Sequence, residues 1–121
     1  MTFRIMLGAT LLFASSAVLA CDYPDRPHIP DGSTATKEEL LAARDGVNQF
    51  FEGVDEYLRC IEAEAKESLD ADSASDQERQ ERDEELNRTF DAANGEKAMV
   101  GELLNKQIRA YNAKRQQESE E

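Results

Sequence analysis

The sequence predicts an all-α fold: an antiparallel two-helix hairpin, coiled-coil-like, with an extended proline-rich N-terminal strap tied to it by a disulfide. Two long stretches repeat apolar residues at intervals of three, four and seven, which is typical of helices that pack along one stripe. A short polar stretch separates them, and two cysteines, Cys21 and Cys60, stand before and inside the first of them.

Residues 1–20 have the three zones of a secretory signal peptide. Arg4 supplies the positive charge, an apolar run follows, and Val18 and Ala20 occupy the −3 and −1 positions of a cut before Cys21. The chain is therefore expected to be periplasmic or secreted. No other stretch is apolar enough to span a membrane.

A cut before a cysteine leaves two fates open for Cys21. The sequence Val-Leu-Ala-Cys that ends there partly resembles a bacterial lipobox, so a lipid anchor on Cys21 is one alternative. An exported chain with two thiols more often pairs them, which favours a disulfide between Cys21 and Cys60. That bridge is the one site predicted here.

Residues 21–35 are expected to form the extended strap. Pro24, Pro27 and Pro30 recur with the three-residue period of polyproline II, and Asp31-Gly32 predicts a turn. Fifteen residues in that conformation reach roughly 46 Å, and Cys60 lies only about 36 Å along the helix from Thr36. The strap can therefore run back along the helix to Cys60. Its apolar residues, Tyr23 and Ile29, are expected to cover the edge formed by Leu41, Phe51 and Leu58.

The helical hairpin is expected over residues 36–115. Thr36 and Glu39 form a capping box before a helix at about 37–69, and Ser75 and Glu78 form another before a helix at about 76–114. Asp55 and Arg59 are placed for an ion pair one turn apart on the first helix. Residues 116–121 are expected to be a disordered tail.

Two features of the hairpin are the continuity of its second helix and the alignment of the two helices. Asn94-Gly95 either breaks the second helix or costs it about 1 kcal/mol, and both alternatives stay open. Folding about residue 72 places apolar residues beside apolar residues over most of the length, and the expected pairs are Leu58 with Leu86, Val54 with Phe90, Phe51 with Ala93 and Leu40 with Leu104. The same stripes would also suit a homodimer, as a four-helix bundle.

The charge of the chain excludes some partners and favours others. It has 26 acidic and 14 basic residues, and removal of residues 1–20 takes away Arg4, which leaves a formal charge of −13. Such an excess repels nucleic acid and anionic lipid, whereas a basic protein would be attracted. We therefore expect a protein partner, basic if charge selects it, and no nucleic acid.

No catalytic, cofactor or metal site is predicted. His28 is the single histidine, and no residue pattern supplies it with a nucleophile and an orienting group. The acidic stretch 62–85 departs from the calcium-binding loop of an EF-hand, with Ala74 and Ser75 at positions that need a ligand and a glycine. The chain is expected not to be an enzyme.

Four short runs carry a resemblance to known proteins: Cys21-Asp-Tyr-Pro, Ile29-Pro-Asp-Gly, Ala35-Thr-Lys-Glu-Glu and Tyr57-Leu-Arg-Cys. Together they resemble a group of small exported helical proteins of Gram-negative bacteria. The resemblance covers the first half of the mature chain and brings no activity with it. There is a looser similarity to cysteine-linked periplasmic lysozyme inhibitors of the LprI type, which carry more cysteines.

Three functions are consistent with these features. The first is a non-enzymatic cell-envelope protein that binds another protein through its helical surface. The alternatives are an inhibitor of a secreted enzyme such as lysozyme, suggested by the acidic surface, and a periplasmic chaperone-like protein.

Overall fold

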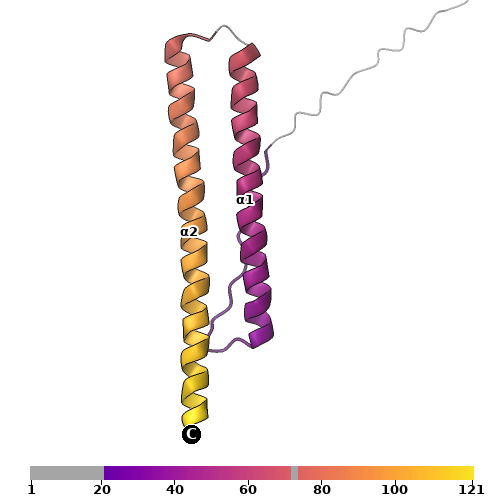
Figure 1. Cartoon of the computed structure of the whole chain (residues 1–121), viewed down its shortest axis with the longest axis vertical. Helices are drawn as coiled ribbons and strands as arrows, with labels where there is room; N and C mark the ends of the chain where they lie inside the picture. The colour runs from indigo at the N-terminus through magenta and orange to yellow at the C-terminus, as the bar shows by residue number, and fades with distance from the viewer. Residues whose placement is uncertain (1–20, 72–73) are drawn as a thin grey trace, which may run out of the picture.

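The computed structural model describes residues 21–71 and 74–121, and within these ranges it contains two helices and no strand. Helix α1 spans Lys37–Ala71 and helix α2 spans Asp76–Glu120. They lie side by side in opposite directions, and the end of α2 projects past the start of α1 (Figure 1). The all-helical prediction is confirmed, and the expected signal peptide, 1–20, lies outside the described residues.

Both helices begin with the capping boxes that the sequence predicts. The Thr36 amide donates to Glu39 Oε2 at 2.7 Å, and the Glu39 amide donates back to Thr36 Oγ1 at 3.2 Å. Ser75 and Glu78 exchange the same two bonds at the start of α2. These bonds satisfy amides that have no partner inside a helix, so they set where each helix starts.

Helix α2 is longer and more continuous than the sequence alone indicates. It runs through Asn94-Gly95 without a break, and an added Cβ at Gly95 would meet nothing within 4 Å. It also continues to Glu120, through residues that we expected to be a disordered tail. No glycine or proline follows Gly101, and Lys114 and Glu118 lie one turn apart with their charged atoms 4.0 Å from each other.

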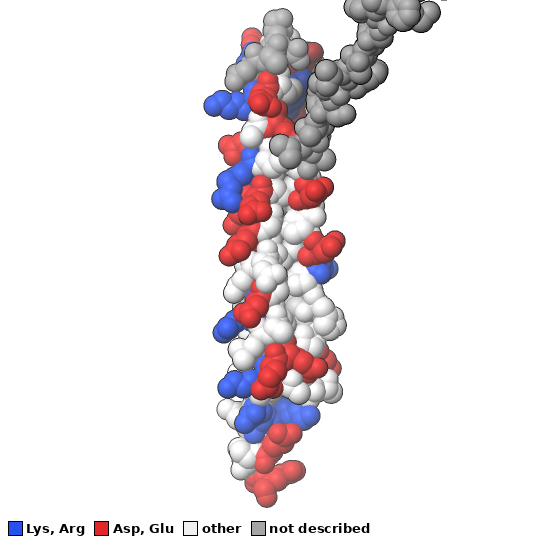
Figure 2. Space-filling model, turned by 90° about the vertical axis from the view of Figure 1, so that its right-hand side faces the viewer, with Lys and Arg blue, Asp and Glu red and all other residues white. Residues whose placement is uncertain are grey.

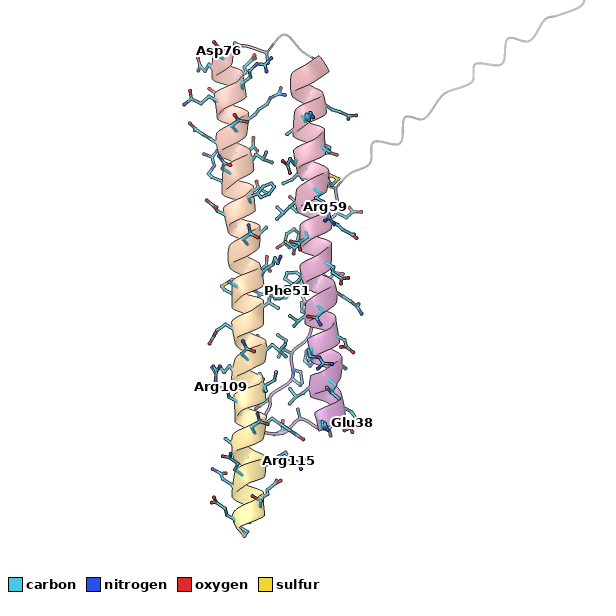
Figure 3. All side chains as sticks on the ribbon, viewed as in Figure 1. Glu38, Phe51, Arg59, Asp76, Arg109 and Arg115 are labelled. Atoms are coloured by element: carbon cyan, nitrogen blue, oxygen red, sulfur yellow. A yellow bond between two sulfur atoms is a disulfide. The ribbon has the colours of Figure 1, made fainter. Side chains whose placement is uncertain are left out.

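The core is a single seam between the helices. Nine apolar residues are buried in it, and all lie in 40–58 or 93–104: Leu40, Ala43, Val47, Phe50, Val54 and Leu58 on α1, with Ala93, Val100 and Leu104 on α2. Phe51 points from α1 toward α2 at the edge of this seam (Figure 3). Ile29 of the strap packs against the same cluster, so the strap contributes to the core.

The strap runs back along α1 and ends at the predicted disulfide. Cys21 and Cys60 are bonded, with their Cα atoms 5.7 Å apart. From there the chain descends to α2 and turns into α1 at Asp31 (Figure 1). The Asp31 carbonyl accepts from the amides of Thr34 and Ala35, and its carboxylate accepts from the Ser33 amide and hydroxyl. Those two bonds from Ser33 hold the pKa of the Asp31 carboxyl below its usual value.

Prolines of the strap pack on a row of small residues in α1. Pro24 lies over Gly53, and Pro27 lies over Gly46. Together with the bridge from Cys21 to Cys60, these contacts show that the strap runs antiparallel to α1. Three residues of polyproline II advance about 9.3 Å, and seven residues of α-helix advance about 10.5 Å. The three-residue period of the strap therefore matches the seven-residue period of Gly46, Gly53 and Cys60, and the contact repeats along the helix.

This matched spacing predicts a graded series of glycine-to-alanine variants. Gly95→Ala and Gly46→Ala are expected to raise the free energy of unfolding by up to about 1 kcal/mol, because alanine is the better helix former. A Cβ at Gly46 would sit 3.5 Å from Pro27, an ordinary contact, whereas one at Gly53 would sit 2.8 Å from the Pro24 Cβ. We expect this close contact to cancel the gain in Gly53→Ala. In urea denaturation, the free energy of unfolding of Gly53→Ala should be at least about 1 kcal/mol lower than that of Gly95→Ala. Equal stability of these two variants would contradict the packing.

The strap lies on the opposite edge of α1 from the one expected. Tyr23 packs edge-on against Phe50 and Tyr57, with ring centroids 6.2 and 5.0 Å away, rather than against Leu41 and Phe51. Leu41 is instead 40% exposed. The disulfide explains the difference, because Cys60 lies on the same side of α1 as Phe50 and Tyr57 and draws the strap to that side.

The helices pair about one heptad away from the expected alignment. Phe51, expected beside Ala93, lies against Gly101, where a Cβ would be 3.4 Å from the ring. Lys97 donates to Asp55 at 2.7 Å across the seam, so Asp55 pairs with α2 and not with Arg59. Near the loop, Arg82 donates to Ser68. A shift of seven residues superposes one apolar stripe on itself, so apolar periodicity alone does not distinguish the two alignments.

Candidate functional site

Within the described residues, the cover that the strap gives to the helix pair reaches as far as the disulfide. Beyond Cys60, toward the loop, a groove of about 400 Å³ lies between α1 and α2. Its walls are Tyr57, Ile61, Glu64, Ala65 and Ser68 from α1, with Arg82, Glu85, Leu86 and Thr89 from α2. We call these nine residues the loop-end groove.

The loop-end groove continues the line of the strap. Tyr57 contacts Tyr23 of the strap and also lines the groove, and the Glu64 carboxylate lies within 4.8 Å of both sulfur atoms of the disulfide. The strap and the groove therefore occupy successive parts of one channel on the same face of the helix pair. The disulfide marks the boundary between the covered part and the open part.

The groove has an apolar floor and charged walls. Tyr57, Ile61, Ala65 and Leu86 are half-buried, in contrast to the fully buried seam beneath the strap. Glu64 and Glu85 are exposed, and neither forms an ion pair within 21–71 and 74–121. Such an arrangement suits binding of a chain segment with apolar and positively charged groups.

Contacts between the strap and α2 hold the strap in place over the covered part of the channel. The Tyr23 hydroxyl donates to Glu96 at 2.8 Å, and Arg26 lies 3.4 Å from the same carboxylate. Lower down, the Gly32 amide donates to Gln107 Oε1 at 2.9 Å. The strap thus bridges both helices, being bonded covalently to α1 and by hydrogen bonds to α2.

The contact of Tyr23 with Glu96 predicts a loss of stability at high pH. Although Tyr23 is 39% exposed, partial burial of its phenol and the hydrogen bond to Glu96 raise its pKa to about 12 from 10.0. The unfolded phenol then loses its proton first, so the stabilising contribution is complete below pH 10 and is lost as the pH rises toward 12. Phenolate absorbance of the wild type minus that of Tyr23→Phe should show a midpoint well above 10. A midpoint at 10 would contradict this contact.

The structure brings together the predicted site residues and adds the groove that sequence reasoning missed. Cys21 and Cys60 are joined as expected, and His28 is exposed on the strap. Cys21, Cys60 and Glu64 form the one cluster with the spacing of metal ligands among the described residues, but its two sulfur atoms are bonded to each other. The groove had one signal in the sequence: Tyr57 and Glu64 share a heptad row, on the side of Cys60.

Neither helix in the described part of the chain has the length and apolar character that a membrane span needs. Compared with family models, with curated proteins and with solved structures, the chain has no match in any of the three.

Proposed function

We propose that this chain is an exported, non-enzymatic helical protein of the cell envelope that binds another protein. The observation that carries the proposal is the open loop-end groove. Among the described residues the strap covers the seam only as far as Cys60, and the three half-buried apolar side chains beyond it, Ile61, Ala65 and Leu86, have no comparable cover there. Half-covered apolar surface of this kind, rimmed by charge, is typical of protein interaction sites.

The disulfide supports the proposed export of the chain. A structural bridge between distant cysteines persists in an oxidising environment such as the periplasm. A thioether lipid anchor on Cys21 would need the same sulfur atom that bonds Cys60. The intact mass of the mature protein decides between the alternatives, because the bridge removes two hydrogens and a lipid adds fatty acyl groups.

Site-specific photo-crosslinking tests the binding proposal. A photoreactive benzoylphenylalanine at Thr89, on the wall of the groove, is expected to give a discrete protein adduct in exporting cells. The matched control is the same group at Asn48, which is exposed on α1 and outside the groove. No adduct at Thr89, or the same adduct from both positions, would overturn the proposal.

A second candidate function is inhibition of a basic secreted enzyme such as lysozyme, which the excess of acidic residues favours. Purified protein added to a lysozyme assay at low salt should slow cell-wall hydrolysis, and added salt should reverse the effect. Unchanged hydrolysis at several-fold molar excess would remove this candidate.

A further inference from the structure

We propose that the loop-end groove takes an extended, positively charged segment of the partner, laid in line with the strap. This inference rests on the proposed binding function and names the chemistry of what binds. It follows from the continuity of the groove with the strap channel, from the length of the groove and from its charge.

The strap shows how this face of the molecule accommodates an extended chain. Its backbone lies along a heptad row of α1, and it bonds to α2 through Tyr23 and Gly32. The loop-end groove is the next section of the same channel, with α1 and α2 again supplying one wall each. The strap itself is an extended segment held between α1 and α2, so an extended segment is the shape for which this face already provides an example.

The dimensions of the groove set the length of the segment. Its α1 wall runs from Tyr57 to Ser68, eleven residues apart, which is about 16 Å of helix. An extended chain advances about 3.1–3.3 Å per residue, so about five residues would fill it. At the far end, the bond from Arg82 to Ser68 joins the two walls.

The charge of the walls selects a basic segment. Glu64 on α1 and Glu85 on α2 are exposed and form no ion pair within 21–71 and 74–121, and together they outnumber Arg82, the one basic residue in the lining of the groove. The surrounding stretch, 62–85, holds eleven carboxylates and three basic residues, so an acidic segment would be repelled. Seen from the α1 side, a largely uncharged strip runs down the molecule, with both acidic and basic side chains beside it (Figure 2). Apolar residues between the basic ones would meet Ile61, Ala65 and Leu86.

Fluorescence anisotropy of labelled peptides tests the inference on the full mature protein. The probe is a peptide of three Lys-Pro-Leu repeats, which is extended, basic and of the same period as the strap, and its acidic counterpart has Glu in place of Lys. The basic peptide is expected to bind saturably and the acidic one not to bind. Equal binding of both peptides, or of neither, would overturn the inference.

Two variants locate the binding in the groove. Glu64→Gln with Glu85→Gln should weaken binding of the basic peptide about fivefold or more. Glu52→Gln with Glu84→Gln is the matched control, because it removes the same charge from exposed positions on the same two helices outside the groove. Ala65→Phe fills the groove without changing charge and should abolish binding, with circular dichroism to confirm folding. Equal losses in the two glutamine pairs would show attraction by overall charge and overturn the assignment.

Competition separates this inference from the binding function itself. If the adduct formed at Thr89 is displaced by the basic peptide and not by the acidic one, both statements are supported. If the adduct forms and the basic peptide does not displace it, the protein binds a partner of different chemistry and only the present inference fails. If no adduct forms, the proposed function fails first.

Discussion

Replacing both Cys21 and Cys60 with serine is expected to lower the free energy of unfolding by about 4 kcal/mol. The bridge joins residues 39 apart, and in the chain-entropy model a closed loop of that length contributes about this much. A small domain has only about 5–15 kcal/mol of stability in total, so the loss would be a large share of it. Urea denaturation followed by circular dichroism measures the change.

Reduction of the wild-type protein is the matched control for this variant. Because both treatments free the strap and leave the helices unaltered, the reduced wild type and the double variant should unfold at the same urea concentration. Tryptophan is absent from the chain, so release of the strap is followed through its contacts: the high-pH titration of Tyr23 should return toward 10 in both samples. Unaltered stability after reduction would show that the strap is held without the bridge.

Gly32→Ala is expected to be the most damaging substitution of a single glycine. Gly32 is buried against α2, and a Cβ there would collide with the carbonyl oxygen of Gln107, a backbone atom inside a helix. The strap would have to move away from α2 and lose the hydrogen bond from the Gly32 amide to Gln107. We expect a loss of about 1–3 kcal/mol, the usual cost of overpacking.

The measurement for Gly32→Ala is urea denaturation beside two controls. Ser33→Ala changes the neighbouring residue, which is exposed and contacts only Asp31 through its side chain, so its effect should be small. Gln107→Ala removes the hydrogen bond without introducing a clash, so it should lower the free energy of unfolding by less than Gly32→Ala does. If Gly32→Ala is as stable as the wild type, the strap does not approach α2 as described.

The starts of both helices, the disulfide and the Asp31-Gly32 turn could be predicted from the sequence. The helix starts and the turn depend on a few neighbouring residues, and the disulfide depends on whether the strap is long enough to reach Cys60. Thr36 with Glu39, and Ser75 with Glu78, carry their own hydrogen-bonding partners within one turn. Two cysteines allow only one internal pairing. The Asp31-Gly32 turn was also predicted, but the role of its glycine was not, because Gly32 is needed for close approach to Gln107 and not for a positive φ.

The prediction of which edge of α1 the strap covers was wrong, although the sequence contains a pattern that indicates the correct edge. The side of α1 on which Cys60 lies also carries Gly46 and Gly53, and the prolines of the strap pack closely on the helix at these two glycines. Gly53 and Gly46 lie seven and fourteen residues before Cys60, and prolines follow Cys21 at intervals of three, so the spacing in the sequence indicates this row. Treating Phe51 and Leu41 as the covered edge neglected the direction in which the bridge draws the chain.

By itself, the sequence determined that the chain forms two capped helices, and it favoured a bridge between the cysteines that returns a proline-lined segment along the first helix, because local hydrogen bonds and chain length decide these features. Only the tertiary structure decided how far the helices slide past each other and that a groove lies between them beyond Cys60. An apolar stripe that repeats every seven residues fits its partner at several offsets. The choice among them is made by contacts between distant residues, such as Lys97 with Asp55 and Phe51 with Gly101.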